Sequence, residues 1–71
     1  MTREILKNKI IELLKRKDMT SIELRNELLN EIGNLNAVEF RETLAELVKE
    51  GIVEKYPVYE KKKFYFRLKS S

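Results

Sequence analysis

The sequence contains no cysteine and no histidine. The chain therefore has no disulfide, no thiolate or imidazole ligand for a metal ion, and no imidazole base for Ser or Cys hydrolase chemistry. Its two glycines, Gly33 and Gly51, are too few for a phosphate-binding loop or a dinucleotide fingerprint. Its carboxylates fall mostly beside Lys or Arg, where solvated ion pairs are the default. We expect a protein that is not an enzyme and takes no metal and no cofactor.

Long apolar runs are also missing, which excludes a membrane-spanning helix of the usual length. Lys7, Asn8, Lys9 and Glu12 interrupt the apolar residues near the start, so we expect no export signal. The length of 71 residues suits one small core. The sequence thus predicts a single cytoplasmic domain over residues 1–71.

The basic charge is concentrated near the end of the chain. Residues 1–51 hold nine Lys and Arg against ten Asp and Glu, whereas residues 52–71 hold six against two. The densest part is Lys61, Lys62 and Lys63, directly before the aromatic run 64–66. Such a run is either a solvated hairpin tip that discourages edge-to-edge strand pairing or a contact for a polyanion.

Helical spacing of apolar residues predicts a first helix over about 3–17, with Thr2 as its N-cap. Its buried stripe is Leu6, Ile10, Leu13 and Leu14. Ile5 and Ile11 lie outside this stripe. They either complete a small core or, with Tyr56 and Tyr59, leave a surface for a second copy of the chain.

A second helix is expected over about 21–31, capped by Thr20 or Ser21 and closed by Gly33 in the left-handed region. A third is expected over about 37–50, where Asn36-Ala-Val-Glu39 predicts a capping box. In that box Asn36 accepts the Glu39 amide and the Glu39 carboxylate reaches back to the Asn36 amide. The apolar stripes are Leu24, Leu28 and Ile32 in the second helix and Phe40, Leu44, Leu47 and Val48 in the third.

After Gly51 the apolar period changes from helical to alternating, which predicts strands at about 52–56 and 62–68. Pro57 cannot donate to a strand ladder and is expected to end or edge the first strand, with a loop from Pro57 to Lys61. The predicted class is α+β, with three helices followed by an antiparallel two-stranded hairpin.

This order resembles the winged-helix branch of the helix-turn-helix family of DNA-binding proteins, over nearly the whole chain. The segments that carry the resemblance are Thr20-Ser-Ile-Glu-Leu24, the stretch from Leu44 to Val53, and Phe64-Tyr-Phe-Arg-Leu68. The resemblance implies a transcription regulator that binds double-stranded DNA, with the third helix in the major groove and residues 57–63 as a wing. It also implies pairing as a homodimer on two half-sites.

On this sequence the resemblance assigns DNA contacts to the start of the third helix and to the wing. The expected contact residues are Asn36, Ala37, Glu39, Arg41, Lys61, Lys62 and Lys63, with Lys55 as an addition. Arg41 suits the O6 and N7 edge of guanine, and the lysines suit phosphates.

Three carboxylates on the third helix, Glu39, Glu42 and Glu46, keep an alternative open. In that alternative the chain is a winged-helix module for protein contact, and the acidic face binds a basic partner. The other interpretation of Glu42 and Glu46 is that they pair with Arg41 and Lys49, or with neighbours of Glu50, on an exposed face.

Overall fold

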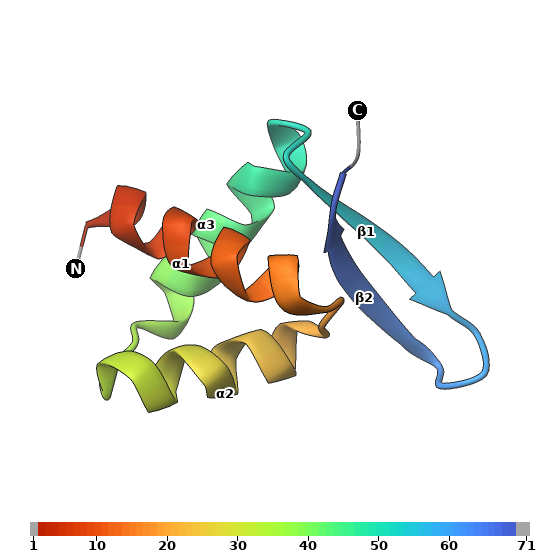
Figure 1. Cartoon of the computed structure of the whole chain (residues 1–71), viewed down its shortest axis with the longest axis horizontal. Helices are drawn as coiled ribbons and strands as arrows, with labels where there is room; N and C mark the ends of the chain where they lie inside the picture. Colours follow the sequence, from red (N-terminus) through yellow and green to blue (C-terminus); the bar gives the residue numbers. More distant parts are fainter. Residues whose placement is uncertain (1, 70–71) are drawn as a thin grey trace.

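The structure is a computed structural model that describes residues 2–69; Met1, Ser70 and Ser71 of the expected domain span lie outside the described residues. Three helices precede a two-stranded antiparallel sheet (Figure 1). The elements are α1 (Arg3–Arg16), α2 (Ser21–Ile32), α3 (Ala37–Lys49), β1 (Val53–Val58) and β2 (Lys63–Leu68). The predicted α+β class is confirmed, and the layout is compatible with a winged helix.

Polar caps begin all three helices. The Thr2 hydroxyl accepts the amide of Ile5 at 3.3 Å, as expected for the start of α1. At α2 the Thr20 hydroxyl accepts the Glu23 amide at 3.1 Å, and the Glu23 carboxylate accepts the Thr20 amide at 2.9 Å. The reciprocal capping box of this chain is therefore at α2, where both orphan amides are satisfied.

The capping box expected at α3 is only half formed. Asn36 Oδ1 accepts the amides of Val38 at 2.9 Å and Glu39 at 3.0 Å, which confirms Asn36 as the N-cap. The expected return bond from the Glu39 carboxylate is wrong, because both Glu39 oxygens bind the guanidinium of Arg3. A charged donor outcompetes a neutral backbone amide for a carboxylate.

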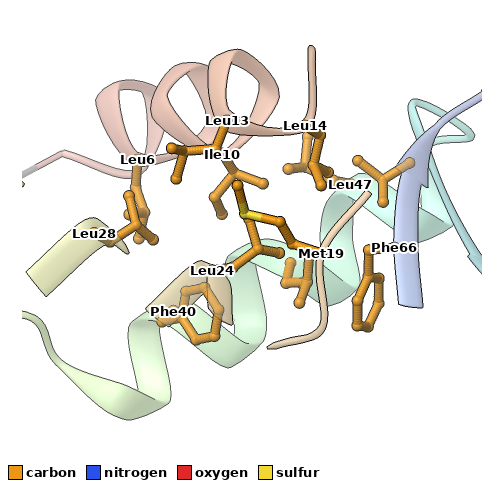
Figure 2. Close-up of a cluster of buried hydrophobic side chains, with 12 residues drawn as sticks. Leu6, Ile10, Leu13, Leu14, Met19, Leu24, Leu28, Phe40, Leu47 and Phe66 are labelled. Carbon is orange, nitrogen blue, oxygen red and sulfur yellow. The ribbon is translucent and has the colours of Figure 1, made fainter. Parts of the chain in front are cut away.

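The core lies where the three helices meet β2, and Figure 2 shows side chains from all four elements converging on it. Its buried members are Leu6, Ile10, Leu13, Leu14, Met19, Leu24, Leu28, Phe40, Leu44, Leu47, Val53 and Phe66. Each predicted helical stripe contributes, although Ile32 and Val48 are only half-buried. Ile11 packs against the core, as one alternative expected, whereas Ile5 remains 47% exposed.

A bridge at Met19 ties the hairpin to the helices. The Met19 amide donates to the Phe66 carbonyl at 3.1 Å, and the Phe66 amide donates to the Met19 carbonyl at 2.7 Å. The loop between α1 and α2 consequently runs beside β2 (Figure 1). Both residues also bury their side chains, so polar and apolar contacts fix the hairpin at the same point.

The first strand of the hairpin extends further toward the turn than the sequence indicated. The expectation that the first strand ends at Tyr56 is wrong, since β1 continues to Val58, and the expected loop from Pro57 to Lys61 is replaced by a turn over residues 59–62. Pro57 lies within β1 opposite Phe64. A proline is tolerated there because the sheet has two strands and each one is an edge strand.

No helix in residues 2–69 is long and apolar enough to cross a membrane.

A pair of identical substitutions tests the assignment of the core. Ile10 is 0% exposed and Ile5 is 47% exposed on the same helix. Ile10→Val should lower the free energy of unfolding by about 0.5–1.5 kcal/mol, because it removes a buried methylene. Ile5→Val should change it by less than about 0.5 kcal/mol. Urea unfolding of both variants measures the difference, and equal losses would contradict the assigned core.

Candidate functional site

One side of α3 is acidic and faces α1. Glu39, Glu42 and Glu46 project toward Arg3, whose guanidinium contacts all three carboxylates. The distances are 3.0 Å from Nε to Glu39, 3.1 Å from Nη2 to Glu42 and 3.1 Å from Nη1 to Glu46. We refer to these four residues with Lys7 and Glu50 as the α1–α3 ion-pair cluster.

Lys7 completes the cluster one turn further along α1. Its Nζ lies 2.7 Å from Glu46 and 3.2 Å from Glu50. The expectation that Glu42 and Glu46 pair with Arg41 and Lys49 on their own helix is wrong. Packing of α1 against α3 brings cations from another helix closer, and the hydrogen bonds of a planar guanidinium suit several carboxylates at once.

The cluster shifts the titration of its members. The hydrogen bond from Arg3 lowers the pKa of Glu39, and hydrogen bonds from Lys7 and then Arg3 lower the pKa of Glu46. The same contacts raise the pKa of Arg3 and of Lys7. All of these groups stay ionised near neutral pH, and the two cations of α1 offset half of the four negative charges on this side of α3.

The opposite side of α3 borders a groove of about 530 Å³. The first turns of α2, the exposed side of α3 and the two strands enclose it, and its floor is formed by the buried Phe40, Leu44 and Phe66. Its charged lining residues are Arg25 from α2, Arg41 from α3 and Lys55 from β1. No carboxylate lines this groove among the described residues.

A second depression of about 460 Å³ continues the groove toward the hairpin turn. It shares Ser21, Ile22, Lys55 and Phe66 with the first and adds Lys62 and Lys63. Its one carboxylate is Glu23, which is engaged in the cap of α2; the hydrogen bond from the Thr20 amide lowers its pKa. We call the combined surface the cationic groove, defined by Arg25, Arg41, Lys55, Lys62 and Lys63.

The cations of this surface are not neutralised within the described part of the chain. Arg25, Arg41, Lys62 and Lys63 form no ion pair with any carboxylate of residues 2–69. Lys55 Nζ lies 4.6 Å from the centre of the Phe64 ring, a contact that keeps its charge. Because the two depressions share four residues, these cations lie along one surface from the start of α3 to the hairpin turn.

The residues expected to contact DNA do not all lie in this groove. Ala37 and Arg41 line its first part, and Lys62 and Lys63 line its second part. Lys61 instead donates to the Tyr65 hydroxyl at 3.2 Å, and this bond raises the pKa of Lys61.

Two other expected contacts have structural roles. Asn36 caps α3, and Glu39 belongs to the α1–α3 ion-pair cluster.

Arg25 and Ile22 line the groove but were not among the expected contact residues. Ile22 follows Ser21 by one residue and Arg25 follows it by four, so all three lie on one side of α2, next to the buried stripe. That spacing identifies a shared side of the helix. It does not reveal that this side faces Arg41 and Lys55, because these come from α3 and β1.

No group of three or more acidic side chains in residues 2–69 is arranged to hold a metal ion. Comparison of the chain with protein-family models, with curated proteins and with solved structures finds no match.

The α1–α3 ion-pair cluster should make stability depend on pH. Because Glu39 and Glu46 have pKa values below the ordinary 4.5, their contribution is fully present above about pH 4.5 and is lost as pH falls through the lowered values. Arg3→Gln should therefore destabilise the protein at pH 7 and much less at pH 3. Urea unfolding midpoints at the two pH values measure this.

Arg16→Gln is the matched control, since Arg16 is an exposed residue of α1 and has no ion pair within residues 2–69. It should change the midpoints little at either pH. A destabilisation by Arg3→Gln that is the same at pH 7 and pH 3 would show that the cluster does not carry the effect.

Proposed function

We propose that this protein is a winged-helix protein that binds double-stranded DNA through α3 and the hairpin, as a regulator of transcription. One observation carries the proposal: the cations of the cationic groove are unpaired within the described residues and continuous, whereas the carboxylates of α3 bind α1. A duplex carries two phosphate charges per base pair, and a row of unpaired cations attracts such a polyanion.

The two ends of the groove fit different parts of a duplex. α3 would enter the major groove with its N-terminal half near base edges, where Arg41 suits the O6 and N7 acceptors of guanine. Arg25 in α2 and the hairpin lysines would bind phosphates on either side of that helix. Lysines in a turn can follow a phosphate backbone without strict geometry.

Pairing of two copies is part of the proposal. A single domain of this size has few base contacts, and two-fold pairing onto half-sites about one helical turn apart doubles them. Ile5 and Tyr59 remain 47% and 84% exposed and are available for such a contact.

The alternative, a protein-contact module that uses the acidic side of α3, has less support. Glu39, Glu42 and Glu46 already bind Arg3, so a basic partner would have to displace an intramolecular cation. Binding energy would be reduced by the free energy of those contacts.

Fluorescence anisotropy with a random-sequence duplex tests the proposal. If about four phosphates are contacted per chain, log K should fall with log salt with a slope of about −3.6, since each contact releases about 0.9 counterion. Affinity should then fall about a hundredfold between 50 and 200 mM salt. The absence of binding at 50 mM salt would overturn the proposal.

Single substitutions test whether DNA binding depends on the cationic groove or on basic charge anywhere on the protein surface. Arg25→Ala should weaken binding to all duplexes and reduce the salt slope by about 0.9, because it removes one phosphate contact. Lys15→Ala removes the same charge from an exposed site on α1 outside the groove. Equal effects of the two variants would contradict the assigned surface.

A further inference from the structure

Short apolar side chains flank Arg41 on the exposed side of α3. Val38, Arg41 and Ala45 follow one another at i, i+3 and i+7, and Ala37 precedes Arg41 by one turn. Val38 is 56% exposed, and Ala37 and Ala45 are also exposed. Ile22 of α2 is 61% exposed and borders the same groove as Ala37, Arg41 and Ala45.

No other described residue shields these apolar side chains from solvent. Val38 and Ile22 are too exposed to contribute to the core, which is made by Phe40, Leu44 and Leu47 on the other side of α3. Ile22, Ala37 and Ala45 line one groove together with Arg41, and Val38 lies next to that lining on α3. Exposed apolar groups gathered in this way mark a contact site.

Apart from the Ser21 hydroxyl, the groove beside Arg41 has no uncharged polar group or carboxylate among the described residues that could read another base edge. An adenine needs the amide of Asn or Gln, and a cytosine amino group needs a carboxylate. Asn36 Oδ1 already accepts two backbone amides, and Glu42 binds Arg3. No Asn, Gln, Asp or Glu lines the part of the groove beside Arg41 among the described residues.

We propose that Val38, Ala37 and Ala45, with Ile22 beside them, read the 5-methyl groups of pyrimidines in the major groove. The proposal rests on the proposed function, duplex DNA binding by α3. The thymine methyl is the one apolar group on a base edge in that groove, and it is recognised by apolar contact. The two alanines allow the helix to approach the base edges closely, and Val38 supplies the contact surface.

Two pairs of synthetic duplexes that differ only in this methyl test the proposal. Poly(dA-dT) is compared with poly(dA-dU), and poly(dG-dC) made with 5-methylcytosine is compared with unmodified poly(dG-dC). Base pairing is the same within each pair. The methylated member of each pair should bind about three- to fourfold more tightly for each methyl contacted, the value that burial of one methyl group provides.

Val38→Ser and Ile52→Ser form the matched variants, since each replaces an exposed apolar residue and leaves the core intact. Val38→Ser should bring the affinity ratio of both pairs toward one, whereas Ile52→Ser, which lies after α3 and outside the cationic groove, should leave it unchanged. Melting curves of both variants establish that they are folded.

The outcomes distinguish this inference from the function on which it rests. Equal affinities within either pair, with binding that remains dependent on salt, would overturn methyl reading and leave DNA binding in place. A ratio that survives in Val38→Ser would overturn the assignment to α3. No binding to any of the four duplexes would overturn both proposals.

Discussion

Arg3 contacts carboxylates from three positions of α3, spaced at i, i+3 and i+7. This interaction pairs the carboxylates of α3 with α1 and leaves the positive charge of the helix on its other exposed side. With Glu39, Glu42 and Glu46 drawn to α1, the remaining exposed side presents Arg41 among small side chains. Lys7 extends the same effect to Glu46 and Glu50 near the end of the helix. Without these ion pairs, a helix with this many carboxylates would repel a polyanion, so the charge of the groove depends on the packing of α1.

A second constraint is the bridge between Met19 and Phe66. An isolated two-stranded hairpin is at best marginally stable in water, and here it is held by backbone hydrogen bonds to the loop before α2 and by the burial of Phe66. The bridge places the hairpin beside the first turns of α2. As a result Lys55, Lys62 and Lys63 continue the surface begun by Arg25 and Arg41.

The groove brings cations and exposed apolar side chains together in one place. In the proposed complex with DNA, the cations would supply affinity that falls with salt and is largely independent of sequence, and the apolar side chains would supply contacts that depend on the base. The charged and apolar positions alternate along α3 because Arg41 lies one turn after Ala37 and one turn before Ala45. In the proposed complex, α3 would read bases with these side chains, while α2 and the hairpin would contact phosphates on either side.

The amino-acid sequence by itself determined the order of elements, the caps at Thr2 and Asn36, and the apolar stripes of the three helices. These features depend on neighbours within a few residues, so periodicity and cap residues are enough to predict them. The length of β1, the partner of Glu39 and the membership of Arg25 in the groove were decided only by the tertiary structure. The Arg3 contacts join residues 36 to 43 positions apart, and the groove combines α2, α3 and the hairpin. Helical spacing gives the side of an element on which a residue lies, but packing alone decides what that side faces.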